Sequence, residues 1–193
     1  MRPAGDLHIR PVLSRRIDVT DRDDLLSLIK ELAVVHGRVV LSSGREADYY
    51  IDLRRITLHR LGAPLVGRVL VDVCADWSFD AAGGLTLGAD PVGTAMLHAS
   101  RGTIDSFVVR KAEKKHGMQR RIEGPDVAGR RVVVVEDVST TGASPLTAVE
   151  AAREAGAEVI GVALIVDRGA GDPIRAAGLD CRAAYTLADL GLA

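Results

Sequence analysis

Two adjacent acidic residues, Glu136 and Asp137, directly follow four consecutive valines at positions 132–135. Because valine is β-branched and apolar, the run predicts a strand that is buried on both faces, as in a parallel sheet covered by helices. Hydroxyl-bearing residues and a glycine follow over positions 139–144. This order predicts that the acids lie at the carboxyl end of the strand and that a helix begins there, with Ser144 as its N-cap and Pro145 in its first turn.

The small residues after the acid pair could bind an anion. A turn of such residues leaves its backbone N–H groups accessible, and a helix N-terminus favours negative charge, so we expect a phosphate group there. Carboxylates beside a phosphate need a cation or sugar hydroxyls between the like charges, which indicates a phosphorylated sugar with Mg²⁺. The segment is not a Walker loop, because it contains no Gly-Lys-Ser or Gly-Lys-Thr. For the two acids taken alone, a solvated turn before a well-capped helix is the alternative.

The string from Val132 to Ser144 resembles the 5-phosphoribosyl 1-pyrophosphate (PRPP) loop of the type I phosphoribosyltransferases, and residues 21–193 resemble the orotate phosphoribosyltransferase family. The resemblance implies transfer of the phosphoribosyl group from PRPP to orotate in pyrimidine (UMP) synthesis, with Mg²⁺ held mainly by PRPP. It also implies that Glu136 and Asp137 are catalytic and bind the ribose of PRPP. The further PRPP contacts that it implies are Val138, Ser139, Thr140, Thr141, Gly142, Ala143 and Ser144.

Positive charge is concentrated in residues 110–117, directly after the apolar segment 104–109, which we predict to be a strand. A solvated basic turn is one interpretation of such a run. The polar segment 117–129 contains three glycines, which is typical of a mobile lid. The pattern Arg-Lys-x-x-Lys-x-His-Gly is similar to that of orotate phosphoribosyltransferases. The resemblance implies pyrophosphate binding by Arg110, Lys111, Lys114 and His116, of which Lys114 and His116 are also catalytic. It further implies a homodimer in which the lid reaches the active site of the partner subunit.

Residues 39–53 predict a β-hairpin, with Gly44 in its turn. A plain edge hairpin with tyrosines as strand formers is the alternative. In the resembling family this hairpin forms a hood over the orotate ring, which implies that Tyr50 binds orotate. Ile51 and Ser42 depart from the family pattern, which has an aromatic residue at the first position and often a lysine at the second.

A second junction of strand, loop and helix is predicted over residues 81–91, with Asp90 as the N-cap and Pro91 in the first turn. The resemblance implies that the backbone N–H groups of residues 88–90 approach the pyrophosphate. Many relatives have a lysine where this chain has Gly88, so positive charge must come from elsewhere in the chain.

Arg168 follows an apolar strand that we predict over residues 159–166. Most arginines at strand ends are simply solvated, which is the alternative here. A planar guanidinium, however, suits a carboxylate. The resemblance implies that Arg168 binds the carboxylate of orotate, with Thr140 as a further orotate contact.

Strand-like and helix-like segments alternate along the chain without a fixed-period repeat, which predicts an α/β fold with right-handed crossovers. The first helix is predicted to begin at Thr20, in a capping box with Asp23, and its segment to end at Gly37. With the resemblance, we expect the type I phosphoribosyltransferase fold: a mostly parallel sheet flanked by helices, with a small hood. We expect residues 1–19 to be a flexible extension and residues 20–193 to form one domain that includes the hood.

The composition sets the remaining expectations. A net charge of −1 over 193 residues gives no general attraction to nucleic acid or membrane, so we expect neither as a partner. Cys74 and Cys181 lie far apart in apolar segments, which predicts buried free thiols and a cytoplasmic location. Two other functions remain open. A purine phosphoribosyltransferase would share the 136–144 loop, and a PRPP-sensing regulator of the same fold would bind nucleic acid through a basic face.

Overall fold

The four valines form the middle of strand β6 (Arg131–Ser139), and all four are fully buried. Val132 and Val134 belong to one hydrophobic core, whereas Val133 and Val135 belong to another on the opposite face of the sheet. The prediction of a strand covered on both sides is therefore confirmed. The strand runs on through both acidic residues to Ser139, so the acid pair lies within the carboxyl-terminal part of the strand.

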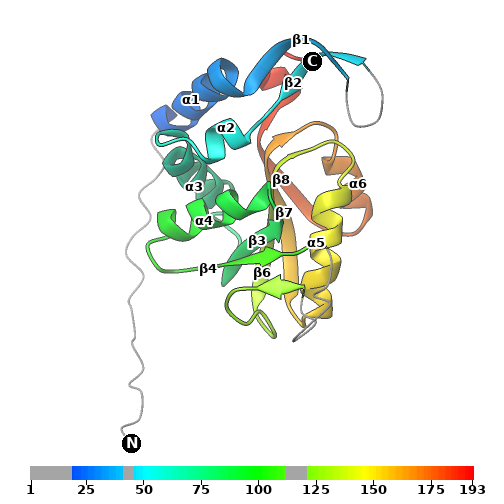
Figure 1. Cartoon of the computed structure of the whole chain (residues 1–193). Coiled ribbons are helices and arrows are strands. Elements are labelled where there is room, and N and C mark those ends of the chain that lie inside the picture. Colours follow the sequence, from blue (N-terminus) through cyan, green and yellow to red (C-terminus); the bar gives the residue numbers. More distant parts are fainter. Residues whose placement is uncertain (1–18, 41–45, 112–120) are drawn as a thin grey trace, which may run out of the picture.

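The computed structural model describes residues 19–40, 46–111 and 121–193. Within these residues the main sheet has the strand order β5-β4-β3-β6-β7-β8 (Figure 1). Its strands besides β6 are β3 (Ala81–Leu85), β4 (Asp105–Val109), β5 (Ile122–Glu123), β7 (Glu158–Asp167) and β8 (Asp180–Thr186). All neighbours pair in parallel except β4 and β5, which are antiparallel. The expected mostly parallel sheet is confirmed.

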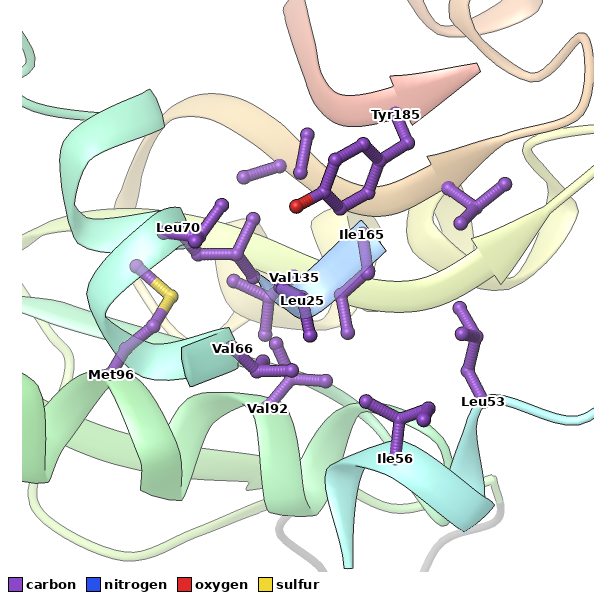
Figure 2. Close-up of a cluster of buried hydrophobic side chains, with 14 of the residues drawn as sticks. Leu25, Leu53, Ile56, Val66, Leu70, Val92, Met96, Val135, Ile165 and Tyr185 are labelled. Carbon is purple, nitrogen blue, oxygen red and sulfur yellow. The ribbon is translucent and has the colours of Figure 1, made fainter. Parts of the chain in front are cut away.

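Helices cover both faces of this sheet (Figure 1). One face is covered by α1 (Val19–Leu28), the π-helical turn η1 (Ile29–Ala33), α2 (Arg54–Thr57), α3 (Gly62–Val73) and α4 (Ala89–Ala99). The other face is covered by α5 (Ala143–Glu154) and α6 (Gly171–Ala176). The core under α3 and α4 includes Leu70, Met96, Val135, Ile165 and Tyr185 (Figure 2).

The predicted hairpin is present as a separate antiparallel pair, β1 (Val34–Val40) and β2 (Glu46–Ile51). It lies beyond the carboxyl ends of the main strands, beside the C-terminal helix α7 (Leu187–Leu190) (Figure 1). Tyr49 of β2 and Leu187 of α7 pack against the same core as Val135. The tail after α6 completes the main sheet through β8 and supports the hood through α7.

Several predicted boundaries were wrong. The first helix includes Val19, so Thr20 lies inside it and does not cap it. Gly37 lies within β1, because the helical segment already ends at Ala33. Part of the segment expected to be a lid, Ile122–Glu123, pairs with β4 at the edge of the sheet. Helix ends are uncertain by one or two residues from local sequence, and the other two differences arise because β1 pairs with β2 and β5 pairs with β4.

Other predictions can be placed only in part. Cys74 and Cys181 are free and buried, as expected. Residues 1–18, Ser42 and Gly44 lie outside the described residues, as do Lys114, Lys115, His116 and Gly117. None of the helices in the described part of the chain is both long enough and apolar enough to cross a membrane.

Candidate active site

Most of the predicted site residues that the structure describes gather at one edge of the main sheet. Strands β3, β4, β6 and β7 run parallel, so their carboxyl ends meet at the same edge. The acid pair ends β6, residues 86–90 follow β3, Arg110 and Lys111 follow β4, and Arg168 follows β7. Ligand sites in open α/β sheets lie at this edge, which makes it the candidate active site.

The two carboxylates of the acid pair lie side by side at the end of β6. Glu136 is only 5% exposed, and Asp137 is partly buried. The backbone N–H of Asp137 donates to Glu136 Oε1 at 3.2 Å, and the N–H of Val138 donates to Asp137 Oδ1 at 2.7 Å. Two neighbouring carboxylates are thus held where little water reaches them.

Burial controls the protonation of this pair. Loss of hydration raises the pKa of Glu136, and the charge of Asp137 raises it further. Burial also raises the pKa of Asp137, but the N–H of Val138 and the hydrogen bond from Glu136 oppose that rise. Glu136 is therefore the partner that keeps a proton to higher pH, and Asp137 is the more readily ionised one.

The predicted anion loop connects β6 to α5. Ser139 is buried, and its Oγ accepts a hydrogen bond from the N–H of Gly142 at 3.2 Å. Thr140, Thr141, Ala143 and Ser144 are exposed, so the loop presents small residues to solvent at the start of a twelve-residue helix. The arrangement suits a phosphate group.

Ser144 is not the N-cap of α5, which corrects the prediction. The helix begins at Ala143, and Gly142 occupies the capping position with φ +75° and no side-chain cap. That φ favours glycine, and a Cβ there would lie 3.1 Å from Ile174 Cγ1. The helix therefore starts two residues earlier than the serine and proline indicated, after a position that only glycine fills without strain.

The loop after β3 lies directly against the acid pair. A Cβ on Gly88 would lie 2.7 Å from Glu136 Oε1 and 2.8 Å from Asp137 Oδ1. Helix α4 begins at Ala89 with Gly88 at the capping position, so the prediction of Asp90 as N-cap was wrong. The Asp90 carboxylate instead accepts a hydrogen bond from Thr86 Oγ1 at 2.7 Å, which closes the loop on itself.

Of the predicted basic cluster, only Arg110 and Lys111 can be placed. Arg110 donates its backbone N–H to Arg121 O at 2.8 Å, and its guanidinium lies 3.6 Å from Glu123 Oε1. Lys111 is exposed. Strand β5 therefore holds Arg110 at the edge of the sheet beside the loop that follows β3.

Arg168 faces the hood. Its guanidinium carbon lies 5.6 Å from the centre of the Tyr49 ring, within the range of a cation–π contact. Its backbone N–H donates to Ser139 O at 2.9 Å, which ties it to the end of β6. Among the residues that the structure describes, its buried Nε has no hydrogen-bond partner. A stacked guanidinium of this kind keeps its N–H edge available for a planar acceptor.

Sequence reasoning missed two residues at this site. It selected Tyr50 from the hood, but Tyr49 is the tyrosine whose ring contacts Arg168. It also passed over Arg54, whose guanidinium donates to Asp52 Oδ1 at 2.8 Å and to the Tyr50 hydroxyl at 3.4 Å. The spacing of Asp52 and Arg54 after a strand was the available signal.

The site also fits a metal that is brought in by a substrate. In the described residues, no group of three or more His, Cys, Asp or Glu side chains comes together as a ligand set. Mg²⁺ commonly keeps several waters and binds phosphate oxygens together with one or two carboxylates. The acid pair supplies the negative field that such an ion needs.

The raised pKa of Glu136 predicts how stability depends on pH. Its pKa rises from 4.5 to about 8 on folding, so the folded chain binds the proton more tightly, and stability falls as pH rises through this range. Glu136→Gln cannot ionise and should gain stability relative to wild type between pH 5 and 9. The gain in the free energy of unfolding should be about 1.4 kcal/mol for each unit by which folding raises the pKa of Glu136.

Urea unfolding at pH 5, 7 and 9 measures this difference. Glu150→Gln removes an exposed carboxylate from α5 and controls for the loss of one charge. Parallel pH curves for wild type and Glu136→Gln would contradict the raised pKa.

Comparisons with known proteins identify the family of this chain. The model of the phosphoribosyl transferase domain family matches residues 96–177. An orotate phosphoribosyltransferase of Streptomyces avermitilis is 67% identical over 177 residues, which cover 89% of this chain and 97% of that protein. One from Corynebacterium glutamicum (strain R) is 62% identical and covers 93% of this chain and 98% of that protein.

Solved structures that resemble this chain are also orotate phosphoribosyltransferases. Orotate phosphoribosyltransferase of Mycobacterium tuberculosis H37Rv, in complex with Fe(III) dicitrate, has a TM-score of 0.83 and 59% identity and covers 89% of this chain and 99% of that one. The same enzyme in complex with PRPP has a TM-score of 0.79 and 53% identity, with equal coverage. At such identity over nearly the whole length of its relatives, this chain belongs to the orotate phosphoribosyltransferase family.

Proposed function

We propose that this protein transfers the phosphoribosyl group of PRPP to N1 of orotate, giving orotidine 5′-monophosphate and pyrophosphate in pyrimidine synthesis. The observation that carries the proposal is the meeting of a buried acid pair, an anion loop and a hood-facing arginine at one sheet edge. The fold and the family agree with this activity. The cytoplasm, where pyrimidine precursors are made, is the proposed location.

In this reaction N1 of orotate loses its proton and forms a bond to C1 of the ribose while the bond from C1 to the pyrophosphate oxygen breaks, and the released pyrophosphate can accept that proton. The leaving group takes the bonding electron pair, so C1 becomes electron-poor, as in glycoside cleavage. Asp137 is the better ionised of the two acids and would stabilise this positive charge, while Glu136 would hold a ribose hydroxyl. Such stabilisation requires no covalent nucleophile.

The 5′-phosphate would bind at the N-terminus of α5. The proposed contacts are the backbone and hydroxyl groups of the loop, namely Val138, Ser139, Thr140, Thr141, Gly142, Ala143 and Ser144. The exposed position of most of these residues at a helix N-terminus supports this assignment.

The pyrophosphate end would bind Mg²⁺ and the basic residues Arg110, Lys111, Lys114 and His116. When bound, Mg²⁺ neutralises charge on the pyrophosphate oxygens, which makes pyrophosphate a better leaving group. Strand β5 holds Arg110 at the sheet edge where the other candidate site residues lie, which supports a role for Arg110 in binding pyrophosphate. Lys114 and His116 are assigned by family resemblance.

Orotate would lie between the hood and Arg168, with Thr140 and Tyr50 as further contacts. The Nε of Arg168 is buried without a protein acceptor in the described chain, which supports a carboxylate ligand. A purine base has no carboxylate to fill this position, so the arginine favours orotate.

The activity has a direct test. Purified protein with PRPP and Mg²⁺ should consume orotate, followed by the loss of orotate absorbance. Uracil, hypoxanthine and adenine under the same conditions should give at least 100-fold lower rates, because a site built for a polar group strongly rejects analogues that lack it. Turnover of adenine or hypoxanthine in preference to orotate would identify a purine enzyme instead.

Arg168→Lys tests the carboxylate contact. Lysine keeps the charge but loses the planar pair of donors, so the KM for orotate should rise roughly tenfold while the KM for PRPP changes less than twofold. Arg153→Lys on α5, an exposed arginine in the last turn of that helix, is the matched control. An unchanged orotate KM would make Arg168 a solvated strand-end residue.

We further propose a homodimer in which Lys114 acts in the active site of the partner subunit and Asp137 in its own. Lys114→Ala and Asp137→Ala should each be poorly active, because every site lacks one group. When the two variants are unfolded and refolded together, mixed dimers contain one complete site of two and activity should return. If mixed dimers form and stay inactive, Lys114 does not act across the interface.

A further inference from the structure

The loop expected to approach the pyrophosphate, residues 86–90, has no cation of its own. Residue 88 is glycine, and any side chain there would begin less than 3 Å from both carboxylates of the acid pair. The backbone of the loop therefore lies in direct contact with Glu136 and Asp137. A positive charge at this end of the site has to come from another element.

Helix α2 is anchored in the same hydrophobic core as strand β6. Leu53 and Ile56 are fully buried in the same core as Val135, the residue directly before Glu136 (Figure 2). The N–H of Asp52 donates to Ala33 O at 3.0 Å, which anchors the chain just before this helix. The first residue of α2, Arg54, thus projects from a firmly held support.

The side chain of Arg54 is oriented by its neighbours. Its Nε donates to Asp52 Oδ1 at 2.8 Å, and its Nη2 donates to the Tyr50 hydroxyl at 3.4 Å. Even so, half of the side chain stays exposed. The guanidinium is therefore held in position but not covered, which suits an arginine that receives an anion.

Arg54 borders a cavity of about 920 Å³ together with Leu87 and Asp90, which flank the glycine of the loop. Another arginine of this cavity, Arg68, is already paired with both carboxylate oxygens of Asp21 at 2.8 Å. The charge of Arg54 also acts on the acid pair, since it lowers the pKa of Asp137 against the effect of burial. Arg54 is thus a cation that lines the same cavity as the two residues on either side of the Gly88–Ala89 segment, and its charge reaches Asp137.

We propose that Arg54 binds the pyrophosphate of PRPP and of the released product, supplying positive charge that the loop at Gly88 does not carry. The inference rests on the proposed function, because it takes PRPP as the ligand. A guanidinium presents two parallel N–H donors to phosphate oxygens, so it can stabilise the leaving group as negative charge grows on those oxygens. Its positive charge, which acts on Asp137, also offsets the repulsion between the acid pair and the incoming pyrophosphate.

Calorimetry with pyrophosphate and Mg²⁺ tests this directly. Arg54→Gln should weaken pyrophosphate binding roughly tenfold or more, as expected for loss of a charge-assisted hydrogen bond. Binding of ribose 5-phosphate, which lacks the pyrophosphate, should change less than twofold. In steady-state assays the KM for PRPP should rise, whereas the KM for orotate should stay within twofold of wild type.

Arg55→Gln is the matched control, because Arg55 follows on the same helix and donates to Leu32 O at 3.3 Å. Arg54→Lys keeps the charge and should give an intermediate loss of pyrophosphate affinity, which also serves if the glutamine variant folds poorly. Equal pyrophosphate binding by wild type, Arg54→Gln and Arg54→Lys would overturn the inference. Wild-type protein that binds pyrophosphate but does not consume orotate would instead contradict the proposed function and leave the role of Arg54 standing.

Discussion

The site depends on two carboxylates held next to each other where water is largely excluded. Glu136 and Asp137 repel each other, and both lose hydration, so the pair is unfavourable when no ligand is bound. The rest of the structure fixes them despite this cost. The apolar valines before them fill the cores on both faces of the sheet, and this burial holds the end of β6 in place.

Close packing around β6 restricts which residues can neighbour the acids. In β3, a Cβ on Gly84 would lie 2.2 Å from Val135 O, and the loop after this strand meets the acids through Gly88. Glycine at these positions lets backbone approach backbone, which brings N–H groups toward the ligand. The loop of residues 86–90 contains no basic side chain, so the surrounding elements have to supply the positive charge.

The hood and the termini are joined to this arrangement by arginine–aromatic contacts. Arg168 extends from the end of β7 to Tyr49 in the hood, so one residue is common to the sheet edge and the hairpin. At the other side, the Tyr185 hydroxyl donates to Arg22 O at 2.6 Å, and the Arg22 guanidinium lies 5.1 Å from the Tyr185 ring. The first described helix is therefore fixed to the last strand.

The sequence by itself determined the elements and their order. A run of β-branched residues, the alternation of strands and helices, and the small polar residues after the acids act over a few neighbours, so they could be recognised locally. The acid pair, the anion loop and Arg168 were found in this way. The PRPP-loop string and the basic pattern at 110–117 also identified the family before any contact was known.

Only the tertiary structure decided which side chains meet. The start of α5 at Ala143, and not after Ser144, goes with the positive φ of Gly142 in the folded chain. The contact of Tyr49 with Arg168 and the cavity that Arg54 shares with Leu87 and Asp90 bring together segments that are far apart in the chain. The raised pKa of Glu136 depends on its burial in the folded protein. Burial and charge interactions depend on distance in space, and a single sequence does not specify that distance.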